Sequence, residues 1–214
     1  MFASFGLVFL IFSATCQQVK VEISVKVACK NIPNKIIFLS IRTLLGKTMI
    51  KAGIISDTHG NIGLFSEIMV YLNDTIKIDK LYHLGDNFSD PDKIKTDAQI
   101  IKVPGLYCPE YDDLSIAKIA YDKLFSANIC LVHNKEILLD EDIDSTQILL
   151  FGHTHKYYVG KENGMFFINP GHLKDKFHRD QIATFGILEI EDKQFCITIL
   201  DKDFRIKEMK RYFI

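Results

Sequence analysis

The stretch MIKAGIISDTHGN at residues 49–61 joins a short apolar run to an abrupt polar turn. The apolar run predicts a buried strand over Ile50–Ser56, because a strand covered on both faces carries few polar residues. A helix is predicted to follow. Asn61 can cap its first turn, and apolar residues then recur at three- and four-residue spacing, as Leu64, Phe65, Ile68, Met69 and Leu72. A buried strand that leads into an amphipathic helix indicates an α/β fold.

Short apolar runs separated by polar turns continue along the chain. Four of them are predicted strands, since each is too short for a stable helix: Leu81–Gly85, Ile100–Val103, Asn128–Val132 and Gln147–Phe151. The C-terminal third predicts two hairpins. One has an Asn-Gly turn within YYVGKENGMFFINPG at residues 157–171, and the other joins Phe185–Ile190 to Phe195–Leu200. Together these elements predict two β-sheets packed face to face as a sandwich, with helices outside.

Residues 1–48 do not fit this pattern. They begin with MFASFGLVFLIFSATC, which is apolar enough for an export signal, but the first basic residue is Lys20 and the run is shorter than the roughly 20 residues that span a bilayer. Three readings stay open: an export or lipid-attachment signal, a disordered extension, and a start codon assigned upstream of a true start at Met49. The third is favoured, because a domain at 49–214 would begin directly with its first strand.

Charge and cysteine content exclude several classes of function. The first 48 residues hold six basic side chains and one acid, Glu22, so the remaining chain has a net charge near −6. This charge repels a phosphate backbone and disfavours a tightly bound nucleic acid. The five cysteines form no CxxC pair, which argues against a disulfide framework and favours a cytoplasmic location. Export or membrane attachment is expected only if residues 1–48 are genuine.

Metal-type ligands follow four of the predicted strands, in SDTHG at 56–60, LGDN at 84–87, LVHN at 131–134 and GHTH at 152–155. Strand ends in an α/β fold open onto a shared crevice, so these distant segments can meet. A single histidine at a strand end is usually solvated or hydrogen-bonded. The conjunction predicts a metal site, whose ligands are Asp57, His59, Asp86, His133, His153 and His155. His83, inside LYHLGD, is interpreted as a structural or supporting residue.

Spacing suggests how these ligands are shared between two ions. Side chains at i and i+2 of an extended segment point the same way, so Asp57 and His59 can hold one ion together. His153 and His155 can do the same or serve one ion each. Two ions about 3.5 to 4 Å apart need a bridging carboxylate, for which Asp86 is the candidate. Imidazole and carboxylate ligands suit Mn, Zn, Fe or Ni, and manganese is the first expectation.

In this order, the motifs resemble the calcineurin-like metallophosphoesterase superfamily, whose pattern runs D-x-H, G-D, G-N-[H/C]-[D/E], H and G-H-x-H. The match covers Met49 to about Ile190 and is most similar to a small bacterial and archaeal phosphodiesterase branch. The resemblance implies a four-layer α/β/β/α fold with two divalent ions. It assigns the first ion to Asp57, His59 and His155, the second to His133 and His153, the bridge to Asp86, and the bracing of the first loop to Asn61.

One departure from the family pattern concerns the second ion. VPGLYCPEYD at residues 103–112 has Leu106 where the family has a metal-ligating asparagine. Leucine cannot coordinate a metal, so either the second ion is held more weakly or Glu110, Cys108 or another nearby group replaces the asparagine. An ordinary loop role stays open for both residues.

A second departure concerns the leaving group. Tyr107 stands where members with G-N-H have a histidine that protonates the leaving group, and His172 stands where the branch has the serine of N-P-G-S. His172 is a candidate replacement acid or phosphate ligand, and a solvent-facing role stays open. Arg179 resembles an arginine that could neutralise a phosphate oxygen, with a surface role equally open.

These residues predict a metal-dependent phosphoesterase, in first place a phosphodiesterase, in which a hydroxide bridging the two ions attacks phosphorus in line. The expected partner is a small phosphate-ester substrate, and self-association stays open. Two alternatives remain. One is a phosphomonoesterase with the same metals. The other is an interaction scaffold of the same fold with little or no catalysis, as in a retromer subunit of the superfamily.

Overall fold

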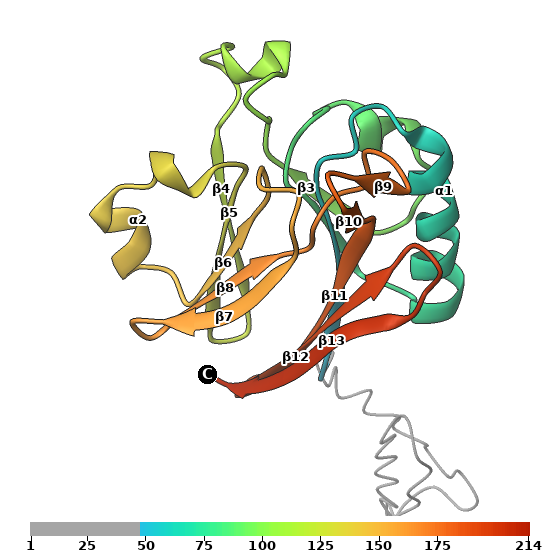
Figure 1. Ribbon diagram of the computed structural model, residues 1–214. Coiled ribbons are helices and arrows are strands. Elements are labelled where there is room, and N and C mark those ends of the chain that lie inside the picture. The colour runs from blue at the N-terminus through green and yellow to red at the C-terminus, as the bar shows by residue number, and fades with distance from the viewer. Residues whose placement is uncertain (1–47) are drawn as a thin grey trace, which may run out of the picture. The chain divides into compact units, whose positions relative to one another are not determined.

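The strand that follows Met49 lies inside a six-stranded mixed sheet (Figure 1). The computed structural model describes residues 48–214. Strand β1 pairs in parallel with β2 and antiparallel with β11, and β2 pairs in parallel with β3. The spatial order is β13-β12-β11-β1-β2-β3. The strand bounds are β1 Ile50–Ile55, β2 Lys80–His83, β3 Gln99–Lys102, β11 Thr184–Ile190, β12 Gln194–Asp201 and β13 Ile206–Phe213.

A five-stranded sheet faces the first one, with the order β4-β5-β6-β8-β7. Its central pairs β5–β6 and β6–β8 are parallel, and hairpins form both edges. The strand bounds are β4 Ile119–Leu124, β5 Ala127–Val132, β6 Ile148–Phe151, β7 Tyr158–Glu162 and β8 Met165–Asn169. A separate short hairpin joins β9 Phe177–His178 to β10 Gln181–Ile182.

The main core fills the space between the two sheets. Strands of the first sheet contribute Ile54, Tyr82 and Ile197, and strands of the second contribute Leu131 and Leu150, all fully buried. Removing this apolar surface from water is the main force that holds the sheets together. The prediction of two facing sheets is therefore confirmed.

Helix α1 (Ile62–Val70) covers the outer face of the six-stranded sheet (Figure 1). The Asn61 side chain accepts a hydrogen bond from the Leu64 N–H, so the predicted cap is confirmed. The helix continues as a π-helical segment, Tyr71–Ile76, and ends at Lys77 with φ +60°. Its apolar side packs against Phe185 and Leu81 of the sheet in a second buried cluster.

Helices are fewer on the other side. The outer face of the five-stranded sheet carries only a small apolar cluster around Cys130 and Phe151, and the nearby helix α2 (Asp140–Asp144) has five residues. The remaining helical elements are single 3₁₀ turns at Asp90–Lys93, Pro109–Tyr111 and Lys135–Ile137.

The strands predicted from apolar runs and from the Asn-Gly turn are present, with ends that differ by at most two residues. Sequence reasoning missed β4, β13 and the short strands β9 and β10. Strand β13 reads IKEMKRYF and forms an edge of the six-stranded sheet, where charged side chains reach water on an exposed strand. It therefore lacks the apolar run by which the buried strands were recognised.

The three readings of residues 1–48 concern residues that, except for Thr48, lie outside those described. The assignment of 49–214 as one domain likewise stays a prediction. Within residues 48–214, no helix is long and apolar enough to cross a membrane.

Candidate metal centre

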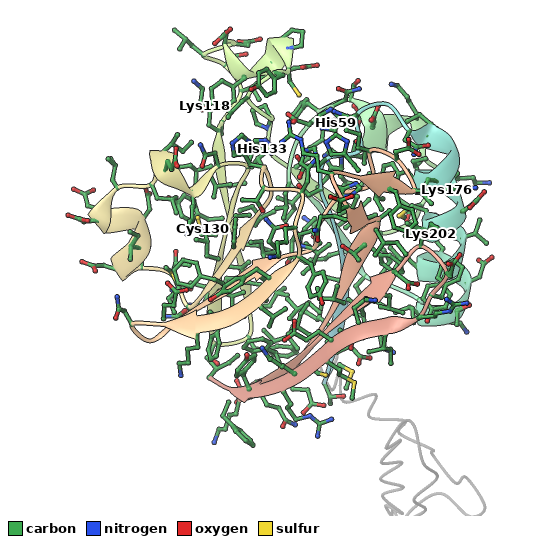
Figure 2. The ribbon with its side chains drawn as sticks, viewed as in Figure 1. His59, Lys118, Cys130, His133, Lys176 and Lys202 are labelled. Atoms are coloured by element: carbon green, nitrogen blue, oxygen red, sulfur yellow. The ribbon has the colours of Figure 1, made fainter. Side chains whose placement is uncertain are left out.

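The ligand-bearing motifs follow β1 and β2 of one sheet and β5 and β6 of the other. Each pair of strands is parallel, so the carboxyl ends within each sheet lie at one edge, and the two edges meet where the His153 N–H donates to Asp57 Oδ2 at 3.1 Å. Figure 2 places His59 and His133 there, beside the gap between the two sheets. The predicted convergence of four distant segments is confirmed.

Four of the predicted ligands form a compact group: Asp57, His59, Asp86 and His155. Each offers one ligand atom within 4.8 Å of the other three. His155 Nε2 lies 3.0 Å from Asp57 Oδ1, and His59 Nε2 lies 3.3 Å from His155 Nε2 and 3.5 Å from Asp86 Oδ2. Two imidazoles and two carboxylates that converge in this way are a donor set suited to a divalent transition metal.

His133 lies on the other side of Asp86. Its Nε2 is 3.6 Å from Asp86 Oδ1, and its ring centroid is 5.2 Å from that of His153. His133 is buried, and its Nδ1 donates a hydrogen bond to the Leu84 carbonyl at 2.7 Å. The lone pair therefore remains on Nε2, which has no hydrogen-bond partner within residues 48–214. The two oxygens of Asp86 thus face histidines on opposite sides, which is the placement expected of a bridging carboxylate.

His153 and His155 serve different sides of the site. His155 packs against His59, whereas His153 packs against His133. Of the two arrangements left open by their spacing, the structure has the one in which each histidine addresses its own position.

The backbone of the ligand loops is strained. The φ angle is positive at Asp57 (+53°), His59 (+47°), Asp86 (+33°), His153 (+67°) and His155 (+60°). The extended geometry assumed for the D-x-H segment is therefore wrong, because these ligands sit in left-handed turns. Such conformations cost of order 1–3 kcal/mol each for residues other than glycine, and they gather at functional sites.

Hydrogen bonds accepted by Asp90 hold the first loop in this conformation. Its carboxylate is fully buried and accepts bonds from the Gly60 N–H (2.8 Å) and the Thr58 hydroxyl (2.7 Å), while its other oxygen meets Lys93 at 2.9 Å. Burial would raise the pKa of Asp90, but these bonds outweigh it and the pKa lies below the usual value. Sequence reasoning missed Asp90, although its place four residues after Asp86 was the available signal.

His83 supports the same loop from beneath. Its Nε2 lies 3.2 Å from Thr58 Oγ1 and its ring stacks on Phe65. Because the Thr58 hydroxyl already donates its hydrogen to Asp90, Nε2 is the donor to Thr58 Oγ1. Complete burial lowers the pKa of His83 to about 4, so the ring is neutral at pH 7. These contacts agree with its interpretation as a supporting residue.

His172 and His178 form a second layer beside His155. The His172 ring centroid lies 5.4 Å from that of His155, and the His178 centroid lies 4.9 Å from it. His172 is buried, and its Nε2 donates to the Gln181 carbonyl at 3.3 Å. Burial lowers the pKa of His172 to about 4, so the side chain is neutral at pH 7. All seven histidines of the chain therefore lie at or next to this site, and His178 was not recognised from sequence.

Two cationic side chains lie near the histidine layer. Lys174 is half-buried, and its charge lowers the pKa of His59 and of His178, in each case after the larger effect of burial. Asn61 ties this segment to the first loop by donating to the carbonyls of Leu173 and Lys174 at 3.1 and 3.3 Å. Arg179 is exposed in the β9–β10 turn, where its φ is +48°. Lys174 was missed because lysine is common on ordinary surfaces.

The 104–111 loop closes the site near Asp86. Leu106 is half-buried, whereas Cys108 is buried with its Sγ 4.0 Å from Asp86 Oδ1. A Cβ added to Gly105 would lie 1.7 Å from that oxygen, so the loop backbone packs directly on the carboxylate. Glu110 is half-buried in the 3₁₀ turn Pro109–Tyr111 and is not part of the compact group.

Protonation states also suit metal binding. Burial would raise the pKa of Asp57, but its hydrogen bonds with the His155 side chain and the Ser56 hydroxyl outweigh that effect, so the pKa lies below the usual value. Burial lowers the pKa of His59 despite the Asp86 carboxylate. Ionised carboxylates and neutral imidazoles are the forms that coordinate metals. Together with the unpartnered Nε2 of His133, they show that these residues fit divalent ions.

Residues 50–193 match the calcineurin-like phosphoesterase superfamily domain. The probable metallophosphoesterase MG207 of Mycoplasma genitalium is 27% identical over 168 residues, which cover 72% of this chain and 90% of that protein. The fold is similar to that of the phosphoesterase YfcE from E. coli, with a TM-score of 0.57, 18% identity, and coverage of 75% of this chain and 98% of that one. It is also similar to Vps29 of Entamoeba histolytica complexed with zinc, with a TM-score of 0.57, 20% identity, and coverage of 77% and 99%.

Proposed function

Because the chain belongs to the calcineurin-like phosphoesterase superfamily, we propose that it is a metal-dependent phosphodiesterase that hydrolyses small phosphate diesters with two divalent ions. The coarser activity, that of a probable metallophosphoesterase, rests on this membership and on the relative from Mycoplasma genitalium. The preference for diesters and the roles of single residues are the proposal.

The placement of Asp86 is the observation that carries the proposal. Its two oxygens lie 3.5 Å from His59 Nε2 and 3.6 Å from His133 Nε2, on opposite sides of one carboxyl group. A carboxylate so placed can join two cations at short range, because it gives each an oxygen and offsets part of their mutual repulsion. In this assignment, the first ion is held by Asp57, His59 and His155, and the second by His133 and His153.

Bound divalent ions would supply Lewis acidity, which activates water and neutralises charge on the phosphoryl oxygens. Lys174 and Arg179 would orient the phosphate from the rim of the site by charge-assisted hydrogen bonds. His172 is neutral at pH 7 and its Nε2 proton is committed to the Gln181 carbonyl. We therefore assign His172 to positioning the neighbouring His155 ring and not to proton donation, so substrates with good leaving groups should react fastest.

The test compares hydrolysis of bis-p-nitrophenyl phosphate and p-nitrophenyl phosphate by the metal-free protein, before and after addition of Mn²⁺ or Zn²⁺. We expect metal-dependent turnover with kcat/KM higher for the diester. Asp86→Ala should lower kcat by about 100-fold or more, because the ions lose their shared ligand. Asp92→Ala is the matched control, since Asp92 is an exposed acid paired with Lys102 away from the ligand group.

Turnover without metal, or an unimpaired Asp86→Ala variant, would defeat the proposal. A higher kcat/KM for the monoester would identify the phosphomonoesterase instead.

Leu106 is the observation that favours the scaffold alternative, because it replaces a metal-ligating side chain with an apolar one. Elemental analysis of the purified protein separates the two functions. About two tightly held ions per chain favour the enzyme, whereas a chain that holds none and shows no turnover favours the scaffold.

A further inference from the structure

The second ion position has too few donors if only histidines and Asp86 are counted. His133 Nε2 and His153 flank one side, and Asp86 Oδ1 contributes an oxygen. Leu106 offers no donor atom. An ion with three protein ligands would need water or a further side chain to complete a tetrahedron.

Cys108 is the side chain that reaches this position. Its Sγ lies 4.0 Å from Asp86 Oδ1, the same oxygen that faces His133. Two donors of one tetrahedral zinc ion lie about 3.3 to 3.8 Å apart, and His133 Nε2 and Cys108 Sγ lie 3.6 and 4.0 Å from the shared oxygen Asp86 Oδ1.

The turn that precedes Cys108 places its thiol beside Asp86. The Cys108 N–H donates to the Gly105 carbonyl at 3.0 Å, which forms a tight turn that carries the side chain back over Asp86. Burial raises the pKa of the Cys108 thiol above its usual value despite the nearby backbone N–H groups of Gly105 and Phe88, so the placement of the sulfur, and not its acidity, carries the argument. The residue is 6% exposed, so water has little access to it.

An independent observation also indicates a missing ligand. His133 is 1% exposed, and its Nε2 has no hydrogen-bond partner within residues 48–214. A buried nitrogen without a hydrogen-bond partner is destabilising unless an ion binds it.

We infer that Cys108 is a ligand of the second ion, together with His133, His153 and Asp86, and that this position selects zinc. Thiolate favours Zn²⁺ over Mn²⁺ or Mg²⁺, whereas the first position has only nitrogen and oxygen donors and suits manganese as well. The inference rests on the proposed two-ion function and extends it, since Cys108 replaces the family's asparagine with a softer donor.

The experiment titrates the metal-free full chain with Co²⁺ and records its absorption spectrum. Cobalt bound to a thiolate shows a near-ultraviolet charge-transfer band, which nitrogen and oxygen ligands do not give. We expect the band to saturate at one equivalent while total binding reaches two. Cys108→Ala should abolish it and weaken the binding of one zinc ion by at least about tenfold.

Two further variants make the result specific. Cys130→Ala removes a buried thiol from the outer face of the other sheet and should leave the band unchanged. Cys108→Asp should keep two bound ions and lose only the band, because an oxygen replaces the sulfur. Circular dichroism checks that each variant folds.

The outcomes separate this inference from the proposed function. Two cobalt ions without a charge-transfer band, or a band that survives Cys108→Ala, would overturn the role of Cys108 and leave the two-ion enzyme intact. Failure of the wild-type chain to bind any ion would overturn both.

Discussion

Asp90 acts on the site through the backbone and not through a direct contact with the predicted ions. Its carboxylate fixes the Gly60 N–H and the Thr58 hydroxyl, and these flank His59 in the strained first loop. Partners of this kind orient metal ligands, and their removal costs about 10 to 100-fold in metal affinity.

We therefore predict that Asp90→Asn weakens the binding of the first ion by about 10 to 100-fold while the chain stays folded. The amide keeps the shape of the side chain but loses the charge that binds Lys93 and the backbone. Competition with a chromophoric chelator measures the affinity. Asp92→Asn, on an exposed neighbour, should have no effect, and equal effects of both substitutions would contradict the prediction.

Gly105 gives a second prediction at this scale. A Cβ at this position would lie 1.7 Å from Asp86 Oδ1 and 2.4 Å from the Asp86 N, so Gly105→Ala must displace the bridging carboxylate. We expect loss of at least one bound ion, measured by elemental analysis. Gly63→Ala, whose Cβ would have 4.0 Å to its nearest neighbour, is the matched control and should keep both ions.

At the scale of elements, a half-buried charged cluster joins the two sheets. Lys80 and Tyr82 of β2 both reach the Asp122 carboxylate of β4, at 2.5 and 2.7 Å. Burial would raise the pKa of Asp122, but these two hydrogen bonds outweigh it and the pKa lies below the usual value. The cluster therefore links β2 of one sheet to the edge strand β4 of the other.

Asp122→Ala should lower the free energy of unfolding by about 1 to 3 kcal/mol, because it leaves the partly buried Lys80 and Tyr82 without their shared acceptor. Urea unfolding of the metal-free protein measures the loss. Glu189→Ala removes the partner of Lys51 in a pair with side chains 35% exposed, and it should cost at most about 1 kcal/mol. A similar cost for both substitutions would refute the structural role of the cluster.

For the whole molecule, the buried neutral histidines predict how stability depends on pH. The pKa of His83 is about 4 in the folded protein, against an ordinary value of 6.5 for the free side chain. Between these pH values His83 is protonated in the unfolded chain but not in the folded chain. The free energy of unfolding therefore falls as the pH drops from about 6.5 to 4.

In the metal-free protein, His83 alone should lower the free energy of unfolding by roughly 2 kcal/mol between pH 7 and pH 5. His83→Gln should reduce this pH dependence by that amount, whatever its effect on stability at pH 7. Urea unfolding at both pH values measures the difference. An unchanged pH dependence in the variant would show that His83 is not the neutral buried group described above.

Local patterns in the sequence specified the parts that depend on neighbouring residues. Apolar runs marked the buried strands, Asn61 marked the start of α1, and the Asn-Gly pair marked the β7–β8 turn. Motifs at strand ends identified the four residues of the compact ligand group, since parallel strands bring their carboxyl ends to one edge. The edge strand β13 was not recognised, because its charged side chains are exposed to solvent and it therefore lacks an apolar run.

Only the tertiary structure determined how those residues are divided between the two proposed ion positions. Three residues were not identified by any motif: Asp90, Lys174 and His178. They lie at the site because the fold brings their segments next to the ligand loops. The split of Asp86 between two histidines, and the approach of Cys108 to one of its oxygens, depend on turns of the 104–111 loop that no periodicity encodes. The sequence shows directly which residue types can bind a metal. How these residues are divided between two ions depends on distances between side chains far apart in the chain, and only the tertiary structure sets those distances.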